Sequence, residues 1–334
     1  MPFTKSGSSI LEGIERGGSA DKLNLGEYKI AGAEITDAVK ATSGYLYSGE
    51  TITPTNYKKS ATQIAFQRAG CRPIKGTAIW DSNGGTGTVY IHRYTDGAVF
   101  VSSTTARDRS GTALGNRRYL LAEICGGGGA GGGGSSSSEG GAGGGGWAYV
   151  MSCIRLPDDG YATLTIGGAG SGNNGTTSSG NAGDGAASKI VCGGYTATAG
   201  GGLGGYNGNL NVASGNRGKA RGGGSASVSG EGADGKCVYQ LGGGNGGDYK
   251  QNGTGLSGSV PAYAPENSAT AYNQGGGATN TNGGGGGASV LAGGGNGNGG
   301  VGNYPGGGGG GGREKVLDAG SGASGAAGCA RLYY

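Results

Sequence analysis

Few side chains in this sequence could carry acid–base chemistry. His92 is the only histidine among the 334 residues, and the segment around it, TVYIHRY, brings no evident nucleophile beside it. We therefore expect His92 to be a surface histidine in a hairpin. Asp158 and Asp159 are adjacent carboxylates, but the sequence Pro-Asp-Asp-Gly is typical of a turn. These residues argue against an enzyme.

The cysteines give no metal site, because they form no Cys-x-x-Cys pair and show no metal-ligand spacing. The six are Cys71, Cys125, Cys153, Cys192, Cys237 and Cys329. Cys125, Cys153, Cys192 and Cys237 lie in or beside short apolar runs, which indicates small buried side chains. Whether a disulfide forms after release from the cell is not decided by the sequence.

Two glycine-rich stretches are similar to known ligand-binding motifs, but each lacks a feature that its motif requires. The stretch from Gly230 to Lys236 has the GxxxxGK spacing of a phosphate-binding loop, but Cys237 stands where a serine or threonine would hold magnesium. The RGGGSAS stretch at Arg221 is similar to the RGG segments of RNA-binding proteins, yet it is single and lies outside any basic cluster. We expect no cofactor, no metal and no nucleic acid.

The elements that would position these residues begin with short strands. GTAIWDS, TVYIHRY and AVFVSST are separated by SNGGTG and TDG, which are hairpin signals. They predict a β-meander in a small β-rich domain over residues 51–116. Residues 1–50 are predicted to be an attachment segment, in which KLNLGEYKIAGAEI forms a short strand or an extended arm. A frayed terminus is the alternative.

Glycine dominates the rest of the chain. Of the 89 glycines, 16 lie in residues 1–125 and 73 in the remaining 209 residues. A flexible linker is the ordinary reading of such composition. Against it, the apolar segments YLLAEIC and WAYVMSCIRL adjoin the first glycine block directly. Because glycine has no side chain, extended segments of it can approach closely and share backbone hydrogen bonds.

The predicted fold class is mainly β and irregular. It combines the small N-terminal β-meander with a glycine-rich bundle of polyproline-II-like (polyglycine) helices, held by short strand anchors. Collagen is excluded because glycine does not recur at every third position. One anchor is expected to be a hairpin, in which YVMSCI and YATLTI flank the turn at Asp158–Gly160.

The glycine-rich part resembles a known family. A strand leading into GGGGAGGGG, a second glycine run leading into an apolar strand, a turn and YATLTIGGAGSG, then a final GGGGGGG and GCARLYY are similar to the glycine-rich domains of bacteriophage tail fibre and tail tip adhesins. The resemblance covers residues 117–334, the predicted adhesin-like domain. It rests on pattern and not on an invariant catalytic motif.

The resemblance implies host-cell attachment through turns displayed on a rigid scaffold. Stretches rich in tyrosine, asparagine and proline are the candidate receptor-binding turns, above all residues 259–274. Tyrosine suits such contacts because its ring is apolar and its tip is polar. The candidate receptor-binding residues are Tyr195, Tyr206, Tyr249, Tyr263, Tyr272, Asn273 and Tyr304.

The expected partners follow from the same resemblance. They are a host surface receptor, either an outer-membrane protein or a polysaccharide, and other tail or baseplate proteins bound through the N-terminal segment. A homotrimer and a monomer both stay open. No signal peptide or membrane span is evident, so we expect a soluble product assembled in the host bacterial cytoplasm and carried on the phage tail.

Two other functions remain as alternatives. One is a purely structural tail or baseplate component without direct receptor binding. The other is an ice-binding or matrix-type glycine-helix protein, which would need a flat and regular face of threonine, alanine or serine. The irregular residues between the glycine runs argue against that second alternative.

Overall fold

The computed structural model divides the chain into two compact units, Met1–Gly76 and Thr77–Tyr334. The structure describes residues 29–30, 33–34, 45–47, 50–52, 78–82, 84–135, 139–173, 180–208, 212, 216–249, 283–289, 291–297, 299–312 and 320–333. In the first unit, two small antiparallel pairs are formed by β1 (Lys29–Ile30) with β2 (Ala33–Glu34) and by β3 (Tyr45–Tyr47) with β4 (Glu50–Ile52). These strands fall within the predicted attachment segment and just after it.

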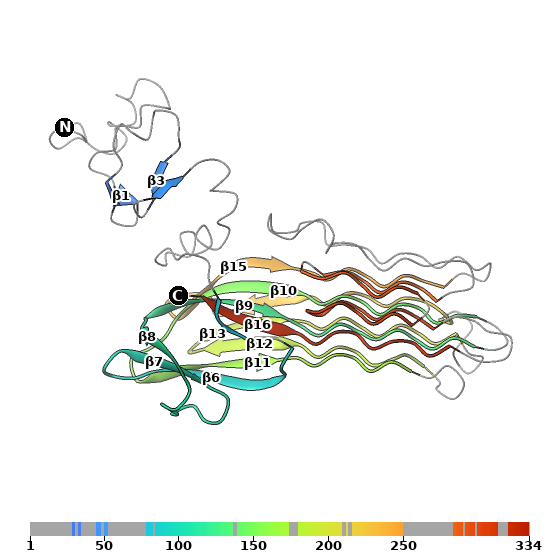
Figure 1. Ribbon diagram of the computed structural model, residues 1–334, viewed down its shortest axis with the longest axis horizontal. Helices are drawn as coiled ribbons and strands as arrows, with labels where there is room; N and C mark the ends of the chain where they lie inside the picture. Colours follow the sequence, from blue (N-terminus) through green and yellow to red (C-terminus); the bar gives the residue numbers. More distant parts are fainter. Residues whose placement is uncertain are drawn as a thin grey trace, which may run out of the picture. The chain divides into compact units, whose positions relative to one another are not determined.

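The second unit contains a seven-stranded antiparallel sheet (Figure 1). Its strands in spatial order are β14 (Ala226–Ser229), β13 (Tyr195–Ala199), β12 (Ser188–Cys192), β11 (Gly160–Ile166), β6 (Gly87–Arg93), β7 (Ala98–Ser102) and β8 (Thr112–Asn116). Apolar and polar residues alternate along β11 and β13, which gives this sheet one buried face.

A five-stranded antiparallel sheet packs against it. Its strands in spatial order are β15 (Gly235–Leu241), β10 (Tyr149–Arg155), β9 (Tyr119–Cys125), β16 (Cys329–Tyr333) and β5 (Ala78–Asp81). The central strands β9 and β10 are buried along nearly their whole length. On the face away from the other sheet, the buried Glu123 carboxylate accepts hydrogen bonds from Tyr149 (2.8 Å) and Tyr333 (2.9 Å), which ties three strands together.

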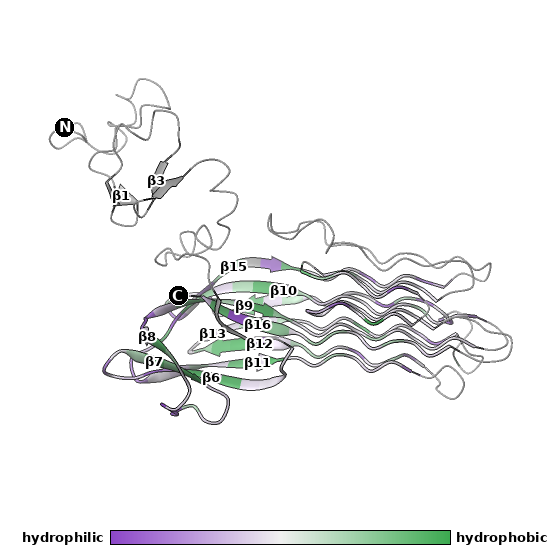
Figure 2. Cartoon of the chain, viewed as in Figure 1, coloured by the Kyte–Doolittle hydropathy of each residue, from purple (hydrophilic) through white to green (hydrophobic). Residues whose placement is uncertain are grey.

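The core of the unit lies between the two sheets. Apolar residues from both inner faces form one cluster, and the strands are the most hydrophobic part of the unit (Figure 2). Its fully buried members include Ile91, Leu120, Ile154 and Leu164. Apolar side chains of this size each contribute about 1.5 to 3 kcal/mol when buried. The sheets therefore form a β-sandwich with its own hydrophobic core.

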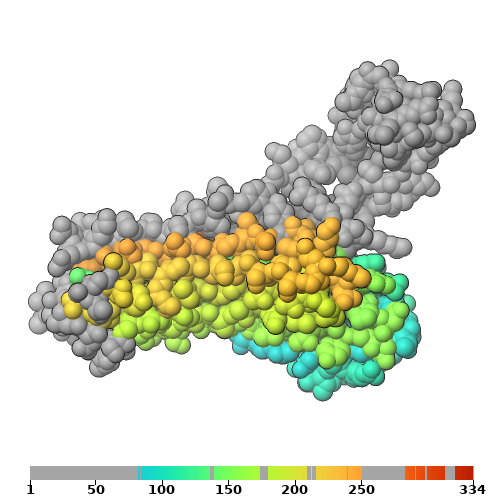
Figure 3. All heavy atoms as spheres, turned by 180° about the vertical axis from the view of Figure 1, so that it is seen from behind, coloured from blue at the N-terminus to red at the C-terminus, as the bar shows by residue number. Residues whose placement is uncertain are grey.

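The glycine-rich tracts extend from one end of this sandwich. The chain leaves the sheets after β9, β11, β13 and β15 and returns at β10, β12, β14 and β16 (Figure 1). We call the extended segments between them the glycine array. Its segments are residues 126–135, 139–148, 167–173, 180–187, 200–208, 216–225, 242–249, 283–289, 292–296, 299–312 and 320–328. From behind, the yellow-green to orange segments, between about residues 167 and 249, lie side by side along one face (Figure 3).

Backbone hydrogen bonds join the array in every direction across its segments. Three consecutive N–H groups donate to three different segments, and the next three return to the same segments in the same order. The donors Gly127, Gly128 and Gly129 bond Ala186 (2.9 Å), Ala326 (2.8 Å) and Gly145 (2.9 Å), and Ala130, Gly131 and Gly132 bond Gly183 (3.0 Å), Ala323 (2.8 Å) and Ala142 (2.9 Å). Carbonyl groups of this segment accept from three further segments. The first glycine tract is thus surrounded by six neighbours.

The array has no space for side chains at its inner positions. A Cβ atom added at Gly131 would overlap the carbonyl group of Gly310, and one added at Gly127 would overlap that of Gly168. The absence of a side chain is what lets these backbones come within hydrogen-bonding distance. The glycine tracts in the described residues are consequently packed segments and not a flexible linker.

The predicted fold class is wrong. The described part of the chain is β-rich, with antiparallel sheets of seven and five strands, and it contains no helix. The apolar segments, taken from the sequence as short anchors, instead build a complete sandwich that carries the core. The physical reason is that each glycine-rich connection begins after one strand and ends before another. These flanking strands lie side by side at the same end of the array and pair with one another.

Two predicted strand pairings are also wrong. The β6–β7 hairpin with its Thr-Asp-Gly turn is confirmed, but β5 pairs with β16 in the other sheet. Similarly, Asp158–Gly160 forms a turn in which Asp159 has φ 52°, yet β10 and β11 belong to different sheets. In both cases a partner distant in sequence replaces the neighbour along the chain.

Candidate functional site

The glycine array has a distal end, far from the sheets, where its segments stop together. Hydrogen bonds there join Ser135 N to Glu139 O (2.8 Å), Gly134 N to Gly320 O (2.8 Å), Gly208 N to Gly133 O (2.9 Å), Gly322 N to Asn173 O (2.9 Å) and Tyr249 N to Gly218 O (2.7 Å). The described residues that flank the stretches 136–138, 174–179, 209–215, 250–282 and 313–319 therefore all lie at this one end, where a Cβ atom added at Gly283 would overlap Gly311.

Asn207 holds three segments together at the distal end. It is fully buried, and its Oδ1 accepts a hydrogen bond from Gly133 N (2.8 Å). Its own N–H donates to Gly180 O (3.0 Å), and its carbonyl accepts from Gly218 N (3.2 Å). One side-chain bond and two backbone bonds of this buried residue together fix the spacing of the segments. Sequence reasoning did not single out this residue.

Tyr249 and Tyr195 were predicted on exposed turns, and the structure buries both. Tyr249 is 6% exposed, and its ring lies against Gly140, where a side chain would overlap it. Tyr195 is fully buried in the sandwich core, and its hydroxyl lies 2.6 Å from Ser152 Oγ. Burial raises the pKa of the Tyr195 phenol. Neither ring is presented to a partner.

Tyr206 lies beside the distal end and is half-buried. The guanidinium of Arg221 is 5.8 Å from the centroid of its ring, and Arg221 forms an ion pair with Asp184 (2.7 Å). Asp184 also accepts a hydrogen bond from Gly204 N (2.7 Å). An aromatic ring next to a paired arginine and aspartate is a surface that can contact polar ligands. No spacing in the sequence links these three residues.

The remaining candidate receptor-binding residues do not lie together at the distal end. Tyr304 is 38% exposed, but it lies near the sheets, where its ring is the nearest neighbour of the turn at Gly84. There the Trp147 indole donates to the Pro305 carbonyl. Tyr263, Tyr272 and Asn273 fall outside the described residues. Of the four described candidates, only Tyr206 and Tyr249 are brought close together, through their bonds to Lys219 and Gly218.

A second polar cluster occupies the opposite end of the sandwich. His92 was predicted at the surface but is 1% exposed, with its Nε2 atom 3.4 Å from Asp159 and its ring centroid 4.3 Å from that of Tyr94. Asp159 also pairs with Arg107 (3.1 Å). The buried imidazole, its edge-to-face contact with Tyr94 and the ion pair of Asp159 together stabilise the Asp158–Gly160 turn. The predicted turn role of this carboxylate agrees with that arrangement.

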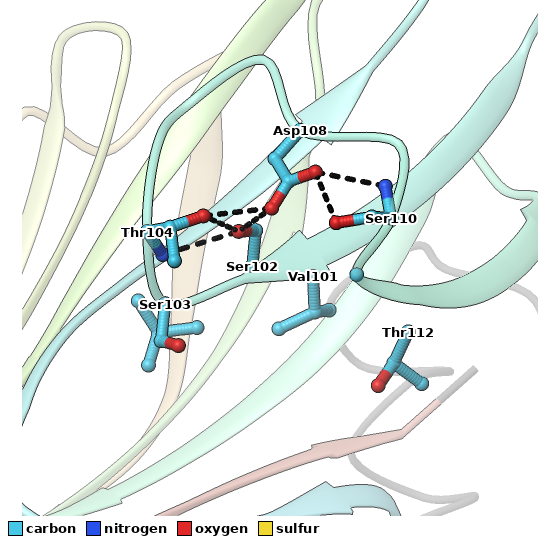
Figure 4. A pocket seen from close by; sticks show the side chains of 9 residues that line it. Val101, Ser102, Ser103, Thr104, Asp108, Ser110 and Thr112 are labelled. Atoms are coloured by element: carbon cyan, nitrogen blue, oxygen red, sulfur yellow. Dashed lines mark hydrogen bonds between the residues drawn. The ribbon is translucent and has the colours of Figure 1, made fainter.

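A cavity of about 420 Å³ lies beside the loop between β7 and β8 (Figure 4). Asp108 accepts hydrogen bonds from Ser102 Oγ (2.7 Å), Thr104 Oγ1 (2.7 Å) and the N–H of Ser110 (2.8 Å). A hydrogen bond from the Ser110 hydroxyl has the largest effect on the carboxyl. Together these bonds hold the pKa of the Asp108 carboxyl well below its usual range. Since the carboxylate is saturated by its own loop, it orders that loop and leaves little capacity for a ligand.

The other motifs have structural explanations. The stretch from Gly230 to Lys236 is the connection of β14 to β15 and the start of β15, and a phosphate-binding loop would need a helix after it. Within the described ranges, no group of three histidine, cysteine or acidic residues is arranged to hold a metal ion. Cys192 is buried, which raises the pKa of its thiol to about 12. Cys153, predicted to be a simple buried hydrophobe, is disulfide-bonded.

Comparison with known proteins finds no family model that matches this sequence and no curated protein with significant similarity to it. Among the residues that the structure describes, there is also no helix with the length and apolar character needed to cross a bilayer.

Proposed function

We propose that this chain is a bacteriophage tail fibre or tail tip protein that attaches the particle to the host cell surface. The contacts would be made by the stretches that leave the distal end of the glycine array. One observation carries the proposal: the segment ends that flank five separate stretches meet at that single end, on a scaffold cross-linked by backbone hydrogen bonds. Recognition is commonly placed on loops that a rigid scaffold presents together.

The sequence of those stretches suits surface recognition. Residues 250–282 form the longest of them and contain Tyr263, Tyr272 and Asn273. Tyrosine and asparagine combine flat apolar area with hydrogen bonding, as in other adaptable binding surfaces. Several copies on one tail would raise the overall affinity through multivalency. The Tyr206–Arg221–Asp184 surface beside the distal end would add to the contact area.

Adsorption of mutant particles tests the proposal. Residues 259–274 are replaced by a short Gly-Ser linker, and the rate at which particles bind host cells is measured. Particles should assemble with the normal amount of this chain and lose adsorption. A control variant, Thr95→Lys, changes an exposed turn at the opposite end of the same unit and should adsorb normally.

Normal adsorption by the linker variant would contradict the proposal. It would favour a structural tail or baseplate component, particularly if antibodies against residues 77–334 also failed to block infection. Loss of assembly in the Thr95→Lys control would show that the measurement reports particle formation, and adsorption would then be measured with purified chain on cells.

A further inference from the structure

Two free cysteines face each other where the neighbouring strands β9 and β16 of the five-stranded sheet meet the glycine array. Cys125 ends β9 and Cys329 begins β16, and they are direct partners in the antiparallel register. Both are fully buried and both are free thiols. They lie on the same face of the sheet, since residues opposite each other in a register point to the same side. Two oxidisable sulfurs are therefore adjacent at the junction of sheet and glycine array.

The geometry of this pair suits a disulfide. Directly opposed residues of antiparallel strands have Cα atoms about 4.5 to 5.5 Å apart. Disulfides join residues whose Cα atoms are about 4.4 to 6.8 Å apart. The strands would thus need little backbone movement to accept the bond.

The other described cysteines do not share this arrangement. Cys192 is opposite Tyr195 on one side and Ala162 on the other, and Cys237 is opposite Ser152. Cys153 lies four residues along β10 from Tyr149, the residue opposite Cys125. That separation is roughly 14 Å at the rise of an extended strand. Its existing disulfide is therefore too far away to exchange directly with Cys125.

We propose that Cys125 and Cys329 are a covalent modification site, which a small hydroperoxide such as hydrogen peroxide oxidises to a disulfide between β9 and β16. One thiolate attacks the peroxide O–O bond, which yields a sulfenic acid and releases hydroxide. The second thiol then attacks the sulfenic sulfur, the S–S bond forms, and water leaves. The hydroxide takes up the proton of the first thiol, so two thiols and one hydrogen peroxide become one disulfide and two waters.

Burial makes this reaction slow in the closed sheet. Burial away from water is the main reason why the pKa of the Cys125 thiol is raised, and the neighbouring Cys329 raises it further. Little of the reactive thiolate is therefore present. Oxidation then depends on local opening of β16, the last strand of the chain. The pair would remain reduced in a reducing cytoplasm and become oxidised outside it.

The positions of Cys125 and Cys329 determine what a disulfide between them would do to the glycine array. β9 leads into the first segment of the glycine array, and β16 follows the last. A bond from Cys125 to Cys329 would close the whole array into one covalent ring. The C-terminal strand could then no longer detach from the centre of its sheet.

Thiol counting on the full chain tests this site. The protein is treated with hydrogen peroxide, denatured, alkylated and analysed by mass spectrometry. The four described free thiols, those of Cys125, Cys192, Cys237 and Cys329, should fall to two, and peptide mapping should recover Cys125 joined to Cys329. The Cys329→Ser variant should keep its three thiols, whereas the variant with Cys192→Ser and Cys237→Ser should lose both that remain.

Retention of all four thiols at peroxide concentrations that oxidise the urea-unfolded chain would overturn the inference. A bond to Cys192 or Cys237, or sulfinic acid at Cys125 without a cross-link, would overturn it as well. If Cys329→Ser fails to fold, the double variant decides alone, because it leaves the proposed pair intact.

Discussion

Tyr195 is buried in the sandwich core, although it was a candidate for an exposed turn. It lies in YTATA, where Tyr195, Ala197 and Ala199 are buried and the two threonines between them are half-buried. Strict alternation of this kind is the signature of a strand with one buried face. The prediction of an exposed turn there rests instead on the stretch from Tyr195 to Asn211, which is rich in tyrosine and asparagine. The alternation was the better guide, and it could have been used.

Asp108 should make the stability of its loop depend on pH. Its pKa is lowered in the folded chain by hydrogen bonds from Ser110, Thr104 and Ser102. A lowered carboxyl pKa stabilises the fold above the unfolded value of about 3.9, and this stabilisation disappears as the pH falls through the folded pKa. The urea unfolding midpoint of Asp108→Ala should therefore lie below that of the unmodified chain at pH 7, and the two should approach each other as the pH falls from ~4 toward the folded pKa.

Ser103→Ala, in the same loop, is the matched control and should follow the unmodified chain at every pH. A gap between Asp108→Ala and the unmodified chain that stays constant down to pH 2 would show that the carboxylate does not act through its charge.

At the scale of elements, the glycine tracts tolerate side chains at some positions and not at others. A methyl group at Gly131 would overlap the Gly310 carbonyl, whereas at Gly222 its nearest neighbour would be 3.8 Å away. Gly131→Ala should lower the free energy of unfolding by about 1 to 3 kcal/mol, the usual cost of overpacking. Gly222→Ala should change it by less, within about 1 kcal/mol, and can be stabilising. Equilibrium unfolding in urea compares the two.

Equal effects of the two substitutions would argue that the array is loosely packed at Gly131. A large effect of Gly222→Ala alone would contradict the arrangement of segments altogether.

The strands show how far local sequence patterns reach. The β6–β7 hairpin is confirmed because its Thr-Asp-Gly turn fixes both the reversal and the register. The partners of β5 and of β10 were missed, since each is chosen by packing across a long separation. β5 pairs with β16, some 250 residues later, and β10 lies between β9 and β15. A turn signal specifies that the chain reverses and leaves open which sheet receives the next strand.

For the molecule as a whole, the second unit should depend on its last strand. β16 lies between β9 and β5, and Tyr333 bonds the buried Glu123 carboxylate. A chain ending at Gly328 would expose one edge of β9 and leave β5 unpaired. We expect it to lose cooperative unfolding, as measured by circular dichroism and limited proteolysis. Replacing β14, a half-exposed edge strand, by Gly-Ser residues should have a much smaller effect.

A truncated chain that unfolds as cooperatively as the full one would mean that β16 is an accessory strand. In that case β9 and β10 alone would hold the five-stranded sheet.

Composition anticipated that the tracts of glycine pack closely and that apolar segments adjoin them, and the bonds within the array confirm this. It did not anticipate the sandwich, because the sequence marks each strand separately and the sheet arises only from their assembly. The candidate site was predicted less well. Tyrosines were chosen by residue type, whereas Asn207, which bonds three other segments through its side chain and backbone together, has no distinctive local pattern.

The orientation of the hydrogen bonds in the array has a mechanical consequence. The bonds run across the segments, while a pull on the tip would act along them. Such a load stresses many bonds in shear at the same time, instead of peeling them apart one after another. A tether that drags a particle against flow would gain strength from that geometry without any gain in thermodynamic stability.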